Sequence, residues 1–204
     1  MDDWTGHFDF AASRAVIERI AVALGLANIL FLIRRSLLNY PFGIAMVTLY
    51  AWIFFEEKLY SDALLQVFFF IIQIYGWMNW RSARDEAGLA RIEKAHRDEA
   101  LGLFIAAATG TLALGGAMAR FTDAAFPFWD ASIAVFSVIA QIMMAQRKLE
   151  NWIVWIIVDA LAIGLYWTKD LHATAFLYAA FLVLSVMGYW SWRRAMRNAN
   201  RAAA

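Results

Sequence analysis

Residues 58–80 read KLYSDALLQVFFFIIQIYGWMNW, and the stretch that begins 112 positions later, residues 170–192, reads DLHATAFLYAAFLVLSVMGYWSW. Each is an apolar run long enough to cross a bilayer as a helix, which takes about 20 residues. The two runs share a glycine and, four positions later, a tryptophan, at Gly76, Trp80, Gly188 and Trp192. Matched glycine and tryptophan at one offset are far less common by chance than matched apolar residues. The pair therefore predicts an internal repeat.

The same offset holds outside these two runs. It relates three further sets of polar or aromatic residues, namely Glu18 to Asp130, Arg35 to Arg147, and Asn39-Tyr40 to Asn151-Trp152. Three spans and one linker span separate equivalent points, so the linker restores the direction of the second set. We therefore expect parallel repeats related by an axis along the membrane normal, with a pathway at their interface.

The composition of the chain indicates that most of it lies in lipid. Its 204 residues are 63% hydrophobic and 16% aromatic, and the mean hydropathy is +0.56. Apolar runs predict seven spans, at 15–33, 41–55, 62–80, 101–119, 129–145, 151–167 and 172–192. The predicted fold is an all-α membrane protein with seven transmembrane helices arranged 3+1+3, as two parallel three-helix-bundle repeats plus a linker helix.

The repeats set the expected domain organisation. It comprises an N-terminal extracytoplasmic tail at 1–14, repeat 1 at 15–81, a cytoplasmic connection with linker helix at 82–126, repeat 2 at 127–193, and a cytoplasmic tail at 194–204. The polar segment from Arg81 to Ala100 is compatible with a solvated loop or with an amphipathic or extended helical connection. The N-terminus has no basic region before its first apolar run, so we do not expect a cleaved signal peptide.

The basic residues are sorted by side of the membrane. On the predicted topology, the side of the N-terminus holds four of them, Arg14, Lys58, Arg120 and Lys169, and the opposite side holds thirteen. The positive-inside rule then places the N-terminus outside and the C-terminus in the cytoplasm.

Several classes of function lack the residues they need. A net charge of +1 argues against nucleic acid as a partner, and a chain without cysteine has no disulfide, thiolate nucleophile or zinc–cysteine site. The histidines lie outside the spans or at their ends and show no metal-ligand spacing. We therefore expect no enzyme, no metal and no cofactor.

Polar and aromatic residues form stripes at helical spacing on four predicted helices, and polar residues within a membrane tend to face a cavity or the bundle interior. The stripes include Gln73 with Trp77, Ser185 with Tyr189, and Trp152 with Trp155 and Asp159. Trp80, Trp192 and Tyr40, near helix ends, are interpreted as interfacial anchors. For Asn39 and Asn151, a capping or turn role and a substrate role both stay open. Glu18 and Asp130 lie near the outer boundary and are either solvated or paired with Arg19.

Asp159 lies near the middle of its span, where an acidic side chain costs about 2.5–3.5 kcal/mol on insertion scales. No lysine or arginine is predicted at that depth. A protonated carboxyl, a hydrogen-bonded polar cluster or a cationic ligand remains as the explanation. Trp155 lies one turn away, and an aromatic face beside a carboxylate suits a flat cationic ring. The repeat mates of Trp155 and Asp159 are Gly43 and Val47, so the site is expected to be asymmetric.

The motifs KLYSDALLQVFFFIIQIYGWMNW at 58–80, AFPFWD at 125–130 and ENWIVWIIVD at 150–159 resemble the Pnu family of bacterial vitamin transporters, the PnuC-like proteins. The resemblance implies a SWEET-like 3+1+3 architecture in the inner membrane. It also implies facilitated diffusion of nicotinamide riboside, trapped by a cytoplasmic kinase. Thiamine, and with less support riboflavin, stay open as substrates, as does proton-coupled transport through Asp159.

The family pattern implies a central substrate site at Gln73, Trp77, Asn79, Asn151, Trp155 and Asp159, to which the stripe on the last helix adds Tyr189. The expected ligand is a cationic vitamin or nucleoside, because Asp159 would complement a positive ring whereas riboflavin is neutral. The other expected partner is the lipid bilayer, and homo-oligomerisation stays open.

Overall fold

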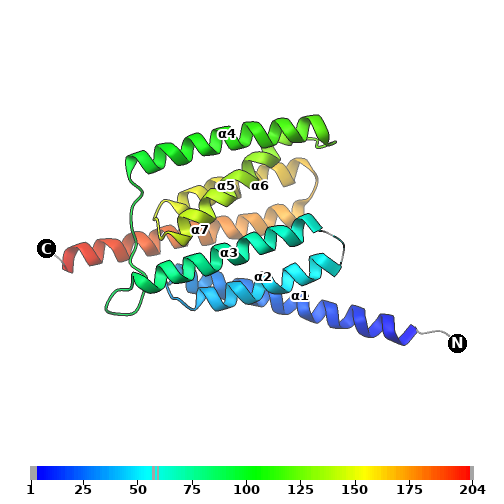
Figure 1. The fold of residues 1–204 in the computed structure, drawn as a ribbon, viewed down its shortest axis with the longest axis horizontal. Helices are drawn as coiled ribbons and strands as arrows, with labels where there is room; N and C mark the ends of the chain where they lie inside the picture. Colours follow the sequence, from blue (N-terminus) through cyan, green and yellow to red (C-terminus); the bar gives the residue numbers. More distant parts are fainter. Residues whose placement is uncertain (1–3, 57, 59, 203–204) are drawn as a thin grey trace. The chain divides into compact units, whose positions relative to one another are not determined.

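A computed structural model describes residues 4–56, 58 and 60–202, which form seven helices in two compact units (Figure 1). The helices are α1 (Trp4–Ile33), α2 (Asn39–Glu56), α3 (Tyr60–Ser82), α4 (Arg97–Phe121), α5 (Pro127–Ala145), α6 (Asn151–Thr168) and α7 (His172–Ala202). The fold is therefore all-helical over the described residues, as predicted. Helix α1 begins at Trp4, well before the predicted start of the first span at residue 15.

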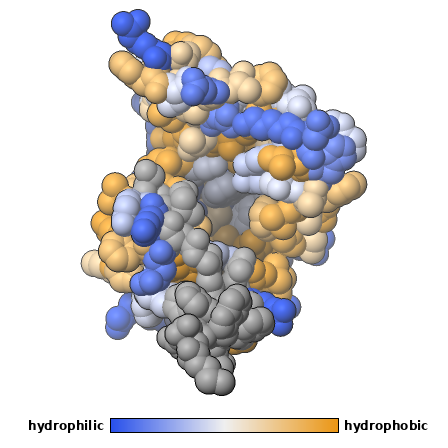
Figure 2. Space-filling view, turned by 90° about the vertical axis from the view of Figure 1, so that its right-hand side faces the viewer, coloured by the Kyte–Doolittle hydropathy of each residue, from blue (hydrophilic) through white to orange (hydrophobic). Residues whose placement is uncertain are grey.

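Among the described residues, five helices are long and apolar enough to cross a membrane, α3 through α7. In α1 the apolar part is the shorter segment Arg19–Ile33. Large hydrophobic side chains are exposed along most helices and cover much of the face in view in Figure 2. A soluble domain would bury these groups, so the exposed apolar surface is consistent with contact to lipid.

Unit 1, Met1–Ala90, contains α1, α2 and α3. Helix α2 packs against both α1 and α3. Helices α2 and α3 pack closely at Gly76 of α3, where an added Cβ would lie 2.6 Å from the Tyr40 hydroxyl oxygen of α2. The ring of Tyr40 also packs edge-on against Trp80, with ring centroids 5.3 Å apart. A glycine is thus needed at 76 to admit the Tyr40 ring.

Unit 2, Arg91–Ala204, contains the other four helices, each packed on the next from α4 to α7. Helix α4 lies on α5, and Ala107 of α4 shares an apolar core with Ile139 and Met143 of α5. Between α6 and α7, Trp152 packs edge-on against Trp192 at 5.5 Å. A Cβ at Gly188 would lie 2.6 Å from the Trp152 ring. The Trp152–Trp192–Gly188 arrangement repeats that of Tyr40, Trp80 and Gly76.

Among the residues that the structure describes, four non-glycine residues have positive φ, and they form two pairs at the same offset of 112, Arg35 with Arg147 and Lys58 with Asp170. Arg35 and Arg147 follow the last turns of α1 and α5. In each case the next backbone N–H donates to the carbonyl five residues earlier, Ser36 to Phe31 and Lys148 to Met143, both at 2.9 Å. This is the Schellman ending of a helix, in which the left-handed residue is usually glycine.

The polar segment before α4 is held by both arginines. In unit 1, Arg35 accepts a hydrogen bond from the amide of Ala90 at 3.1 Å and donates from Nη1 to the Ala90 carbonyl at 3.0 Å and to Asp85 at 3.2 Å. The segment is therefore neither a free loop nor a helix until Arg97. Its backbone is bonded to the turn after α1.

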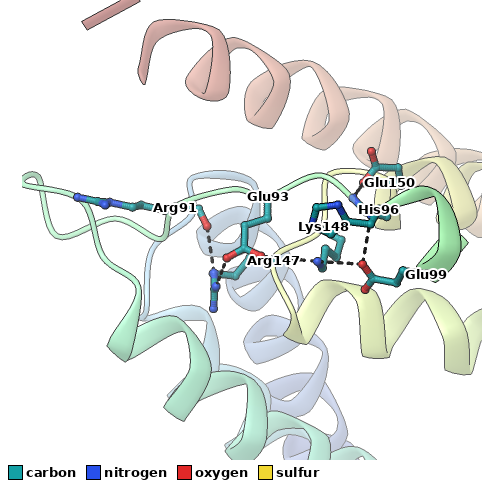
Figure 3. Close-up of polar contacts among 8 residues, drawn as sticks. Arg91, Glu93, His96, Glu99, Arg147, Lys148 and Glu150 are labelled. Atoms are coloured by element: carbon teal, nitrogen blue, oxygen red, sulfur yellow. Dashed lines mark hydrogen bonds and ion pairs between the residues drawn. The ribbon is translucent and has the colours of Figure 1, made fainter. Parts of the chain in front are cut away.

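In unit 2, the turn after α5 holds the same segment further along (Figure 3). Arg147 donates from Nε to the Arg91 carbonyl at 3.1 Å and from Nη2 to the Glu93 carboxylate at 2.5 Å. Lys148 pairs with Glu99 at 3.0 Å, and the amide of Ala95 donates to Glu150. The pKa of Glu93 is lowered, chiefly by its hydrogen bond from Arg147. We call Arg35 and Arg147, with the segment residues they bind, the arginine clamps.

Candidate functional site

In unit 2, Asp159 is almost fully buried, with 2% of its surface exposed. Its carboxylate accepts a hydrogen bond from the Ser185 hydroxyl of α7 at 2.9 Å. Of the explanations that the sequence left open for a carboxyl at mid-span, the structure shows a hydrogen-bonded polar pair. Ser185 stood in a predicted stripe but was not among the predicted site residues. A carboxylate can accept further hydrogen bonds besides this one.

Asn151 and Trp155 precede Asp159 on α6 and each carry a buried polar atom without a partner. The Asn151 side-chain nitrogen donates to the Lys148 carbonyl, which confirms its turn role, but the Oδ1 atom has no hydrogen-bond partner among the described residues. The indole Nε1 of Trp155 also has no hydrogen-bond partner among the described residues. Buried polar atoms are rarely left unpaired, because the loss of a hydrogen bond to water costs about 1–3 kcal/mol. An acceptor and a donor are thus available on one helix.

Helices α6 and α7 are antiparallel. Their register shows where Tyr189 of α7, the last predicted site residue of unit 2, lies along α6. The register that pairs Asp159 with Ser185 and Trp152 with Trp192 puts Trp155 and Tyr189 at one level. The Arg193 guanidinium lies over the Tyr189 ring, 5.9 Å from its centroid. The predicted residues of unit 2 therefore lie along one pair of neighbouring helices.

In unit 1, Gln73 of α3 is buried and lies against Gly43 of α2, where an added Cβ would collide with its amide. That Cβ would also lie 2.6 Å from the Asn28 side-chain nitrogen. Asn28 of α1 donates to the Asn39 carbonyl at 2.6 Å. Two amides thus converge on Gly43, the repeat mate of Trp155. Asn28 was missed by the sequence analysis, although it is a polar residue amid the apolar residues of its span.

The other two predicted residues of unit 1 are placed differently from each other. Trp77 stacks on Tyr40 with ring centroids 6.5 Å apart and 6° between the planes, and it is 39% exposed. Asn79 lies about 120° around α3 from Gln73, at about 100° per residue. The structure therefore brings Gln73 and Trp77 to one side of the helix and leaves Asn79 on another.

Two interpretations from the sequence are wrong. Trp80 and Trp192 are 0% exposed and Tyr40 is 3% exposed, so these rings are packed inside their units and are not interfacial anchors. Their position near helix ends suggested a membrane boundary, but Tyr40 and Trp80 pack edge-on against each other, and Trp192 packs edge-on against Trp152. Asp130 pairs with Lys169 at 3.1 Å, not with Arg19.

Comparison with known proteins identifies the family. The family described as "Nicotinamide mononucleotide transporter" matches residues 15–194. The nicotinamide riboside transporter PnuC of Escherichia coli is 28% identical over 89% of this chain and 87% of its own length. The riboflavin/roseoflavin transporter RibM of Streptomyces davaonensis is also 28% identical, over 89% of this chain and 86% of its own length.

A solved structure is similar as well. The crystal structure of the vitamin B3 transporter PnuC matches with a TM-score of 0.68 and 26% identity, over 94% of this chain and 90% of that one. The resemblance predicted from the three sequence motifs is thus confirmed. This chain belongs to the nicotinamide mononucleotide transporter family.

Proposed function

We propose that the chain is a vitamin transporter of the bacterial inner membrane and that its substrate is nicotinamide riboside. The relatives named for this substrate support the proposal. The observation that carries it within this chain is the unpaired acceptor Asn151 Oδ1 and donor Trp155 Nε1 on the helix of buried Asp159. The ring amide of nicotinamide has one donor group and one acceptor, which this pair would satisfy.

The charge of Asp159 would select among vitamins. Nicotinamide riboside and thiamine carry a cationic ring, whereas riboflavin is neutral. A carboxylate and an indole ring next to it stabilise a bound cation by Coulombic attraction and by a cation–π contact of about 0.5–2 kcal/mol. The relative named for riboflavin keeps that vitamin as an alternative substrate.

A binding titration of the purified protein separates the three vitamins. Tryptophan fluorescence would be recorded against nicotinamide riboside, thiamine and riboflavin, for the wild type and for Asp159→Asn. We expect the variant to lose about tenfold in affinity for the cationic vitamin, equivalent to 1.4 kcal/mol, and to keep its affinity for riboflavin. Asp130→Asn is the matched control, because that carboxylate is paired with Lys169. Equal affinity of wild type and Asp159→Asn for every cationic vitamin would contradict the proposed role of the charge.

We further propose facilitated diffusion, followed by trapping of the substrate by a cytoplasmic kinase. In proteoliposomes, uptake should follow the substrate gradient alone, and binding without flux would overturn a transport function. If an imposed proton gradient accelerates uptake and Asp159→Asn abolishes that effect, the transporter is proton-coupled instead. Gln73, Trp77, Asn79 and Tyr189 remain proposed substrate contacts, to be tested by alanine variants in the same assay.

The proposed topology has seven spans arranged 3+1+3, with the N-terminus outside and the C-terminus in the cytoplasm. The excess of arginine and lysine on one side supports this orientation. Labelling of single cysteines, placed in a chain that has none of its own, tests it: Ala204→Cys should react with impermeant reagent only in inverted vesicles.

A further inference from the structure

Unit 2 contains a cavity of about 340 Å³ beside the segment that leads into α4. Its lining includes the polar residues Lys94, Glu150, Tyr189, Arg193, Arg197 and Asn200, and the apolar residues Leu149, Ile153 and Met196, which we call its apolar wall. A cavity of this size is in the range that holds small ligands. Because the lining combines charged and apolar side chains, a ligand with a charged part and an apolar part would fit it.

The cavity carries uncompensated positive charge. Three cations face one carboxylate, and Glu150 already accepts a hydrogen bond from the Ala95 amide at 2.9 Å. In the part of the chain that the structure describes, no carboxylate is paired with Lys94, Arg193 or Arg197. Unpaired arginine and lysine with a neighbouring amide are the groups that bind phosphate oxygens.

The cavity lies where the apolar part of α7 ends. At 31 residues and about 1.5 Å per residue, this helix is about 46 Å long and exceeds the hydrocarbon core of about 30 Å. Its apolar sequence ends at Trp192, and the arginines follow. Trp190 is 55% exposed, as expected of an aromatic at the headgroup level. The Arg193 guanidinium lies over its ring, 5.3 Å from the centroid.

We propose that this cavity binds a phosphate-bearing anion, and that its occupant is the headgroup of an anionic phospholipid. The phosphate would contact Arg193, Arg197 and Lys94, and the glycerol and first acyl carbons would lie on the apolar wall. Basic pockets between helices at a membrane surface bind such headgroups. The cavity shares Tyr189 with the proposed substrate contacts, so the test measures lipid retention and not transport.

The test is native mass spectrometry of the full chain in detergent, titrated with phosphatidylglycerol or with zwitterionic phosphatidylcholine. We expect one molecule of phosphatidylglycerol to be retained in preference to phosphatidylcholine. The double variant Arg193→Gln/Arg197→Gln should bind it about 25-fold more weakly, since each basic residue near a membrane contributes about a factor of five. Lys94→Gln, which changes a different segment, should weaken it in the same direction.

The matched control is Arg194→Gln/Arg201→Gln, which removes the same charge from the same helix outside the cavity. Unchanged retention in this control supports a defined site. Equal loss in both double variants, or equal retention of the two lipids by the wild type, would overturn the proposal. Competition with glycerol phosphate identifies the source of the anion. Failure to displace the lipid supports a headgroup, whereas displacement at equal concentration would overturn the assignment to lipid.

Discussion

Arg35 and Arg147 occupy equivalent places 112 positions apart, with φ of 58° and 61°, and the side chain of each donates to the backbone of the segment that follows α3. The left-handed conformation ends a helix, and it also turns the side chain toward that segment. A glycine at these positions would adopt the left-handed backbone conformation but would supply no side-chain donor. The arginines therefore combine two roles that are usually assigned to different residues.

The Arg147 clamp should contribute more to stability than the Arg35 clamp. The Arg147 side chain is 7% exposed and that of Arg35 is 18% exposed. We expect Arg147→Ala to lower the free energy of unfolding by about 2 kcal/mol, because it leaves acceptors of the segment without their donor. Arg147→Gly should cost about 1 kcal/mol less than Arg147→Ala, since only glycine adopts positive φ without strain. Thermal unfolding in detergent, followed by tryptophan fluorescence, checks both. A less stable glycine variant would refute the backbone role.

The Gly188 contact predicts an overpacking effect. A Cβ at this position would lie 2.6 Å from the Trp152 ring, which has its own neighbour Trp192 behind it. Gly188→Ala should destabilise the protein by about 1–3 kcal/mol. Gly116→Ala is the control, because nothing lies within 4 Å of its Cβ position. This control should be neutral or stabilising by up to about 1 kcal/mol, as alanine favours a helix. Equal midpoints of thermal unfolding for the two variants would show that the ring moves aside freely.

The Glu93–Arg147 pair predicts a dependence of stability on pH. The pKa of Glu93 is lowered from its ordinary value of 4.5 in the folded protein. The stabilisation is therefore present above pH 4.5 and is lost as the pH falls through the folded-state pKa. The difference in unfolding midpoint between wild type and Glu93→Gln should shrink as the pH is lowered from 7 to about 3. A difference that stays constant over this range would mean that the charge of Glu93 is irrelevant.

The Lys169–Asp130 pair should contribute little. Both side chains are more than a quarter exposed, at 29% and 28%, and exposed pairs are worth about 0–1 kcal/mol. Lys169→Met should therefore shift the unfolding midpoint much less than Arg147→Ala does. A loss as large as that of the clamp variant would show that the pair is shielded from water by something that contacts it in the membrane.

Much of the fold could be predicted from the sequence because hydropathy and the 112-residue offset are properties of the chain itself. The helices α2 to α7 and the position of Asp159 near the middle of its span followed from spacing and composition, whereas the turn role of Asn151 was one of two readings left open. The pairing of Asp159 with Ser185 could not be predicted, because residues 26 positions apart meet only through the register of α6 and α7. Left-handed arginines could not be predicted either, since glycine is the expected residue there. The interpretation of Trp80 and Trp192 as interfacial anchors was wrong because a position near a helix end does not reveal which aromatic ring of the neighbouring helix packs against them.

The arginine clamps also bear on how the chain could be divided. The boundary between the two units falls between Ala90 and Arg91, and each side of it is hydrogen-bonded to its own clamp. A gene split at this point would encode two fragments, each of which retains the arginine that orders its new terminus. Co-expression of such fragments, or a circular permutant opened there, would sever one peptide bond while sparing the hydrogen bonds of both clamps.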